Sequence, residues 1–90
     1  MKKRNRLEII RDILRVIREK KGKIKPTHIL YKSNLSHQMM DEYLYELISK
    51  GFIVENVDGK NRTYSISQKG MMFLEKYRII ADFTESFGLG

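Results

Sequence analysis

The sequence predicts a mainly α-helical domain that carries one small β-hairpin. Two observations point to this fold class. Apolar residues recur every three or four positions in several segments that are bounded by helix start and stop signals. Between 52 and 67 the period changes, and β-branched and aromatic residues flank an Asp-Gly turn. The chain has 90 residues and no cysteine, so we expect a single core without disulfides.

The first helix is expected over residues 4–20. It has a wide apolar face that should touch more than one neighbour, and Gly22 follows two lysines that suit a helix C-terminus. The three residues 23–25 have the pattern of a very short strand. The residues expected on the apolar face are Leu7, Ile9, Ile10, Ile13, Leu14, Val16 and Ile17.

The second helix is expected to begin at Pro26, because proline at the first helical position wastes no backbone donor. Ile29 and Leu30 are its expected buried residues. A tight break over 33–35 follows. There Asn34 is the residue best able to adopt a left-handed conformation.

The third helix, residues 36–50, is the clearest element of the sequence. Ser36 is its expected N-cap, Leu35 and Met40 have the spacing of a hydrophobic staple, and Gly51 is the expected C-cap. Its core stripe should consist of Met40, Tyr43, Leu44, Leu47 and Ile48.

A β-hairpin and a long helix complete the chain. The strands are expected over 52–57 and 62–67, joined by a turn at 58–61. Ser67 should cap a last helix that runs to about Phe87 and spans about 30 Å. This order of helix, helix, tight turn, helix, hairpin and helix is a winged helix-turn-helix with an extended C-terminal helix. We assign 1–70 to that domain and 68–88 to a helix that continues it.

The net charge of +7 is concentrated in one segment. Residues 1–25 hold eleven of the 18 Lys and Arg residues and carry a net charge of +8, whereas 26–90 carry −1. A polyanion, most simply double-stranded DNA, is the leading interpretation. The alternative is a solvated helix laced with salt bridges.

In a helix-turn-helix the N-terminal end of the recognition helix enters the major groove, and a basic wing meets the backbone. We therefore expect 36–50 at the groove and the wing 58–62 on phosphates. An arm of Lys2, Lys3, Arg4 and Arg6 could add backbone contacts, and a frayed, solvated terminus is the alternative. The candidate DNA contacts are Arg4, Lys25, Thr27, Lys32, Ser33, Ser36, His37, Gln38, Tyr45, Lys60, Asn61 and Arg62.

The acids of the expected recognition helix oppose this interpretation. Asp41, Glu42 and Glu46 outweigh Lys50 and leave 36–50 with a net charge of −2. Two explanations stay open. Either only the first turn approaches the groove while the acids face solvent or the arginine-rich first helix, or the basic N-terminus and the wing carry the binding.

The last helix presents apolar residues beyond those needed to close a domain of this size. Leu74 and Tyr77 with Phe73 can close the core, but the chain has nothing left to cover the stripe that follows. Pairing with a second copy would bury it and place two half-sites about 34–36 Å, or a multiple of that, apart. The expected homodimer interface is Phe73, Tyr77, Ile80, Phe83, Thr84 and Phe87.

Other classes of function lack their signals. His28 and His37 are nine positions apart without a ligand pair, no nucleotide-binding or hydrolase motif occurs, and no cofactor, metal or small-molecule substrate is expected. No apolar run reaches 18 residues, and acids and arginines interrupt the basic N-terminus, so neither a membrane span nor a secretory signal is expected. We predict a cytoplasmic, nucleoid-associated protein that is not an enzyme. The alternative is a winged-helix module that binds other proteins within a larger assembly.

Several segments resemble a family of small archaeal winged-helix proteins over about residues 7–89. These segments are "KPTHILYKSNLS", "YL..L...GFI", "Y.IS.KG..FLE.Y" and "FTESFGL". That family includes predicted transcriptional regulators and ten-kilodalton chromatin-associated DNA-binding proteins. The resemblance implies DNA binding, often with little sequence preference, and a homodimer joined by an antiparallel coiled coil of about 73–87. It also implies a structural junction at Tyr64, Ile66, Ser67, Lys69 and Gly70.

Overall fold

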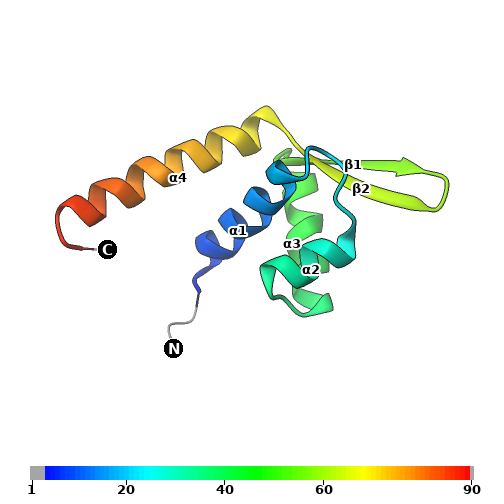
Figure 1. Cartoon of the computed structure of the whole chain (residues 1–90), viewed down its shortest axis with the longest axis horizontal. Coiled ribbons are helices and arrows are strands. Elements are labelled where there is room, and N and C mark those ends of the chain that lie inside the picture. The colour runs from blue at the N-terminus through cyan, green and yellow to red at the C-terminus, as the bar shows by residue number, and fades with distance from the viewer. Residues whose placement is uncertain (1–3, 90) are drawn as a thin grey trace.

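A computed structural model describes residues 4–89 and shows the predicted winged helix-turn-helix. Three helices pack together, the hairpin projects to one side, and the last helix extends to the other (Figure 1). The elements in chain order are α1 (Arg6–Glu19), α2 (Pro26–Ser33), α3 (His37–Ser49), β1 (Ile53–Asp58), β2 (Asn61–Ile66) and α4 (Gln68–Ser86).

Local side-chain caps set the helix boundaries. Asn5 and Glu8 form a capping box at the start of α1, and the Ser36 hydroxyl accepts from the amide of Met39 at 3.2 Å. Asn34 ends α2 in the left-handed conformation, at φ 54° and ψ 54°, as expected. This reversal turns the chain sharply between α2 and α3, so that the two helices cross.

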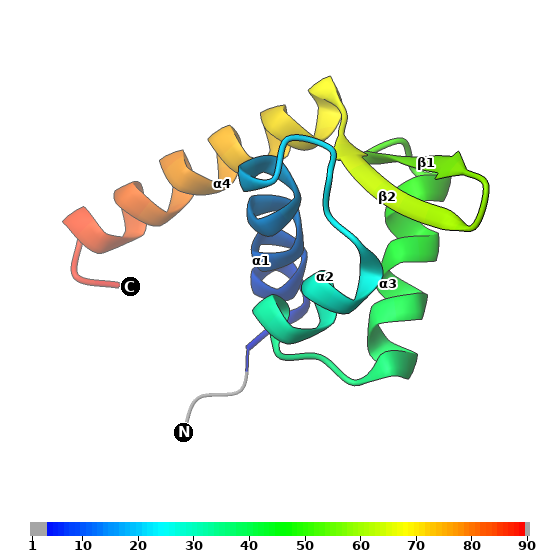
Figure 2. The same cartoon turned by 45° about the vertical axis from the view of Figure 1, so that its right-hand side comes forward.

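The core lies among α1, α2, α3 and the base of the hairpin. Its fully buried members include Ile13, Leu14 and Ile17 of α1. The prediction for Leu7 was wrong, because this side chain is 53% exposed. Figures 1 and 2 show that α1 and α4 diverge towards the start of α1, so α4 does not cover its first turn. The buried core consists of Ile9, Ile10, Ile13, Leu14, Ile17, Ile24, Ile29, Met40, Leu44, Leu47, Ile53, Tyr64 and Leu74.

The hairpin pairs β1 with β2 in antiparallel register, from Ile53 opposite Ile66 to Asp58 opposite Asn61. Two residues therefore form the loop, and the first of them, Gly59, has φ 61°, a conformation that glycine adopts at little cost. The expected short strand at 23–25 is a single bridge, in which the Tyr64 amide donates to the Ile24 carbonyl at 3.2 Å. This bridge ties the segment before α2 to the wing.

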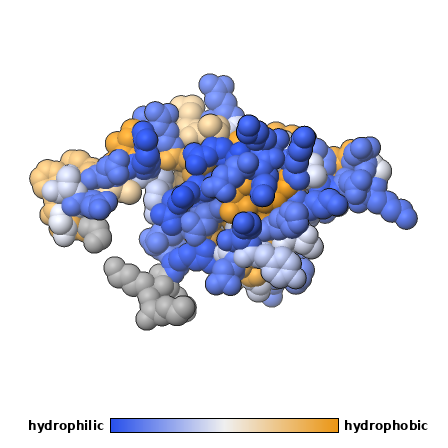
Figure 3. All heavy atoms as spheres, viewed as in Figure 1, coloured by the Kyte–Doolittle hydropathy of each residue, from blue (hydrophilic) through white to orange (hydrophobic). Residues whose placement is uncertain are grey.

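Helix α4 is anchored at its beginning and exposed at its end. Ser67 caps it by accepting from the Gly70 amide at 3.1 Å, and Phe73 packs edge-on against Phe52 with centroids 5.9 Å apart. Further along, Phe83 and Phe87 are 61% and 66% exposed. Figure 3 shows apolar residues at this free end of α4, beyond the body of the domain. One half of the helix thus closes the core and the other half has no partner among the described residues.

Candidate nucleic-acid interface

The first turn of α3 presents polar side chains to solvent. His37 and Gln38 are exposed there, and Tyr45, about two turns further along α3, is 77% exposed. The Gln38 amide nitrogen donates to Glu42 at 3.3 Å, which places this glutamine on the outer face of the helix. These side chains can donate and accept hydrogen bonds, and the base edges in the major groove present matching acceptors and donors.

One of the acids of α3 is engaged in ion pairs, and the other two are exposed to solvent. Glu46 forms ion pairs with Arg6 of α1 and, at 3.2 Å, with Lys50. The hydrogen bond from Arg6, followed by that from Lys50, lowers the pKa of Glu46 below its ordinary value. Asp41 and Glu42 remain exposed. Both observations agree with the first explanation for the acidic helix, in which its acids face solvent or pair with α1 while only its first turn approaches the groove.

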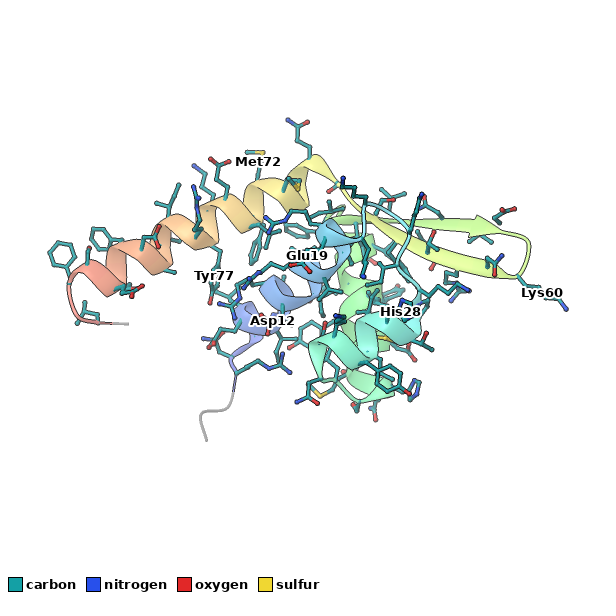
Figure 4. The ribbon with its side chains drawn as sticks, viewed as in Figure 1. Asp12, Glu19, His28, Lys60, Met72 and Tyr77 are labelled. Atoms are coloured by element: carbon teal, nitrogen blue, oxygen red, sulfur yellow. The ribbon has the colours of Figure 1, made fainter. Side chains whose placement is uncertain are left out.

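A shallow groove joins the wing to the start of α2. The bridge between Ile24 and Tyr64 holds the two segments together, and Lys60 stands at the tip of the hairpin (Figure 4). Of the nearby acids, Glu55 lies 3.6 Å from Arg62 and Asp58 stands opposite Asn61 in the hairpin, but both lie outside the lining of the groove. We call this the wing groove, and it is lined by Lys25, Pro26, Thr27, Lys60, Asn61 and Arg62.

Arg4 lies on the body of the domain and not on a free arm. Its guanidinium donates to Asp12 at 2.8 Å and to the Asn34 carbonyl at 3.1 Å, which links α1 to the helix-turn-helix break. Burial raises the pKa of Asp12, but hydrogen bonds from Arg4 and Arg11 outweigh it, so this pKa lies below its usual value. Lys2 and Lys3 lie outside the described residues.

One predicted contact is contradicted by its position. Ser33 is only 1% exposed, because the last turn of α2 places it against the core, so its side chain cannot reach a phosphate. Lys32, the preceding residue, is exposed and available. Ser36 is also exposed, but its hydroxyl serves as the cap of α3.

Comparison with known proteins identifies the family to which this architecture belongs. The family model described as winged helix-turn-helix matches residues 3–85. The chain belongs to this family. A similar sequence is the uncharacterized protein MJ0287 of Methanocaldococcus jannaschii, which is 41% identical over 54 residues. That match covers 60% of this chain and 54% of MJ0287, so it spans about half of the relative.

Solved structures share the fold of this winged-helix chain at low sequence identity. Sso10a-2, a DNA-binding protein from Sulfolobus solfataricus, has a TM-score of 0.80 at 24% identity, and the match covers 93% of this chain and 85% of that protein. AF1382 from Archaeoglobus fulgidus has a TM-score of 0.72 at 13% identity, covering 90% and 91%. A mutant of S. aureus MepR, bound to an oligodeoxyribonucleotide, has a TM-score of 0.75 at 16% identity, covering 88% and 60%.

The winged-helix chain also contains a cluster that sequence reasoning missed. Arg11, Arg15 and Arg18 of α1 face Arg78 of α4 across a crevice. The spacing of the three α1 arginines by four and three positions places them on one face of a helix and could have indicated the cluster. Only the packing of α4 against α1 brings Arg78 to them.

Between residues 4 and 89, no three His, Asp or Glu side chains gather as metal ligands would. No helix in the same range combines the length and the apolar character that crossing a membrane requires.

Proposed function

We propose that this winged helix-turn-helix protein binds double-stranded DNA, with the first turn of α3 at the major groove and the wing groove on the phosphate backbone. The observation that carries the proposal is the wing groove itself. It brings Lys25 and Thr27 together with Lys60, Asn61 and Arg62, which are more than thirty positions further along the chain. The phosphate backbone of DNA binds surfaces on which several cations lie together, and here the cations come from two segments of the chain.

The wing and α3 occupy a common side of the molecule. Figure 2 shows both at the right of the view, whereas α4 leads away to the left. Since α3 carries the exposed polar side chains and the wing carries the cations, one duplex could meet both. Phosphate contacts would then fix the position of the protein, and His37 and Gln38 would contact base edges.

The similar folds support this proposal. Sso10a-2 is a DNA-binding protein, and the MepR mutant was solved with a bound oligodeoxyribonucleotide. Each shares the winged-helix architecture with this chain over most of its length.

We further propose that the protein acts as a homodimer through α4. Within residues 4–89, nothing covers Ile80, Phe83 and Phe87, which are 63%, 61% and 66% exposed. The rings of Phe83 and Phe87 lie 4.9 Å apart and form a continuous apolar surface. Pairing of this surface with its copy would bury it on both chains. Phe73 and Tyr77 already pack inside their own chain, so they would form the inner edge of the interface.

Two biological roles are compatible with this proposal, and measurements of DNA affinity distinguish them. A transcriptional regulator would prefer its own target by about 10³-fold or more, whereas a chromatin-associated factor would bind all duplexes alike with a steep dependence on salt. Both roles fit a dimeric winged-helix protein, and both make it a non-enzymatic one.

The test is a comparison of matched variants in a duplex-binding titration at several salt concentrations. K60Q/R62Q removes two cations from the wing, and K20Q/K76Q removes two exposed cations outside the wing groove. The wing variant should bind more weakly, and its slope of log K against log salt should fall by about 1.8, since each phosphate contact contributes about 0.9. Equal slopes for the two variants would contradict the proposed role of the wing.

The second candidate is a module that binds another protein through α3. Asp41 and Glu42 are exposed beside Tyr45, which is 77% exposed, and this acidic and aromatic surface favours it. Failure of the wild-type protein to bind any duplex at low salt would favour this candidate over DNA binding.

A further inference from the structure

The arginine groove between α1 and α4 is separate from the wing groove. It is lined by four arginines over an apolar floor, and no acid among residues 4–89 contributes to its lining. The side chains come from two elements that are far apart in the sequence. The residues of the arginine groove are Arg11, Arg15, Arg18, Leu74, Tyr77, Arg78 and Ala81.

Most of this charge is not neutralised by ion pairs within residues 4–89. Arg11 pairs with Asp12 at 2.9 Å and lies 5.1 Å from the centre of the Tyr77 ring. Among residues 4–89, Arg15, Arg18 and Arg78 have no ion pair with a carboxylate. Glu75 lines the adjoining crevice with Arg18 and Arg78 but pairs with neither. Convergence of three unpaired arginines is unfavourable by itself and would be relieved by an anionic ligand.

The groove stays open when the proposed surfaces are occupied. Figures 1 and 2 place α4 on the side of the domain opposite the wing, so a duplex on α3 and the wing would not cover it. Arg78 is two positions from Ile80, which is about 200° around a helix of 3.6 residues per turn. A dimer that buries Ile80 would therefore leave the Arg78 side of α4 accessible, and Tyr77 would lie at the boundary between the interface and the arginine groove.

We propose that the arginine groove is a second binding site for the phosphate backbone of a nucleic acid. Arg11, Arg15 and Arg18 follow one another along α1 over about 10 Å, a length that spans about three phosphates of one strand when measured along the duplex axis. Guanidinium groups match phosphate geometry with two parallel donors, and arginine is the usual choice for that contact. A regular row of arginines fits a repeating backbone charge better than it fits an irregular acidic protein segment.

This second site would allow each protomer to bind two nucleic-acid segments at once. With the wing groove on one duplex, the arginine groove could contact another nucleic-acid segment on the opposite side of the domain. The acids that outweigh Lys50 on α3 would then matter less for total affinity, because much of the phosphate attraction would come from α1. Of the eleven cations within residues 1–25, Arg11, Arg15 and Arg18 line this groove.

The test uses the full chain and a duplex of about one helical turn, so that each bound duplex is counted separately. R15Q/R78Q removes one arginine from α1 and one from α4, and K20Q/K76Q removes two exposed cations outside the lining of either groove. Circular dichroism checks that both variants fold. At about 50 mM salt the wild-type protein should bind more than one duplex per protomer, in two steps.

The expected result is loss of the weaker step in R15Q/R78Q and its retention in K20Q/K76Q. The salt slope of that step should fall by about 1.8 for two lost phosphate contacts. Identical titrations of the two variants would overturn the proposal. Binding of polyglutamate that depends on these arginines, without binding of duplex or RNA, would also overturn the proposal. That result would favour an acidic protein partner.

Two other outcomes separate this site from the proposed DNA-binding surface. If K60Q/R62Q binds normally while R15Q/R78Q loses all binding, the arginine groove stands and the proposed role of the wing fails. If an RNA strand of equal length depends on Arg15 and Arg78 and the duplex does not, the phosphate site stands with RNA as its source.

Discussion

Replacement of Phe83 by glutamine tests whether the free half of α4 joins two copies of the chain. An aromatic side chain buries roughly 150–250 Å², and Phe83 is 61% exposed, so about 120 Å² remains to be covered on each chain. At about 25 cal/mol per Å², full burial would contribute about 3 kcal/mol per chain, or about 6 kcal/mol per dimer.

If a dimer covers only half of that area, F83Q still weakens association by about 3 kcal/mol. The dissociation constant of the dimer should then rise on the order of a hundredfold. Sedimentation equilibrium over a range of protein concentrations measures this directly. The glutamine keeps the helix propensity of the position, so the expected change reflects lost apolar contact.

M71Q is the matched control. Met71 is 44% exposed on the same helix but lies nine positions before Ile80, on the opposite side of α4. It should leave the dissociation constant close to that of the wild-type protein. A wild-type chain that is monomeric at about 100 µM, or equal constants for F83Q and M71Q, would refute the reasoning; a Kd near that concentration is only about 5 kcal/mol of association.

Three further predictions concern stability. G70A should lower the free energy of unfolding by about 1–3 kcal/mol in thermal melts, because an added Cβ would lie 2.6 Å from Ile66 Cγ1 and would press on the Phe52 carbonyl; the exposed neighbour variant Q68A should melt like the wild type. S36A should cost about 1 kcal/mol through loss of the bond to the Met39 amide, and an unchanged melt would exclude that cap. The lowered pKa of Asp12 stabilises the folded state above the unfolded pKa of about 4, and this contribution is lost as pH falls through the lower folded value; D12N should therefore flatten the acid limb of stability against pH, and a limb as steep as that of the wild type would contradict the contacts with Arg4 and Arg11.

Much of the fold follows from local chemistry that the sequence displays. Ser36 and Ser67 cap helices because their hydroxyls sit where unpaired amides begin, and Asn34 tolerates the left-handed turn. The Asp-Gly signal located the hairpin, but the loop is the two residues Gly59 and Lys60 and not the expected 58–61, because Asp58 and Asn61 pair. Each of these depends only on residues a few positions apart.

The parts that sequence reasoning missed depend on how distant elements pack. Leu7 has the correct helical spacing for the core, but α4 diverges from α1 and leaves it exposed. Ser33 is polar and follows Lys32, yet the last turn of α2 faces inward. Neither the arginine groove nor the wing groove is visible in the linear pattern, because each joins segments that are more than thirty positions apart.

The most direct test of the central claim is the salt titration of duplex binding by the wild-type protein and by K60Q/R62Q. Random-sequence DNA and the DNA upstream of the protein's own gene serve as two probes of equal length. The proposal predicts salt-dependent binding of the wild type and a slope that is about 1.8 smaller in the wing variant. Absence of duplex binding at low salt would contradict the claim that this winged helix-turn-helix protein binds DNA.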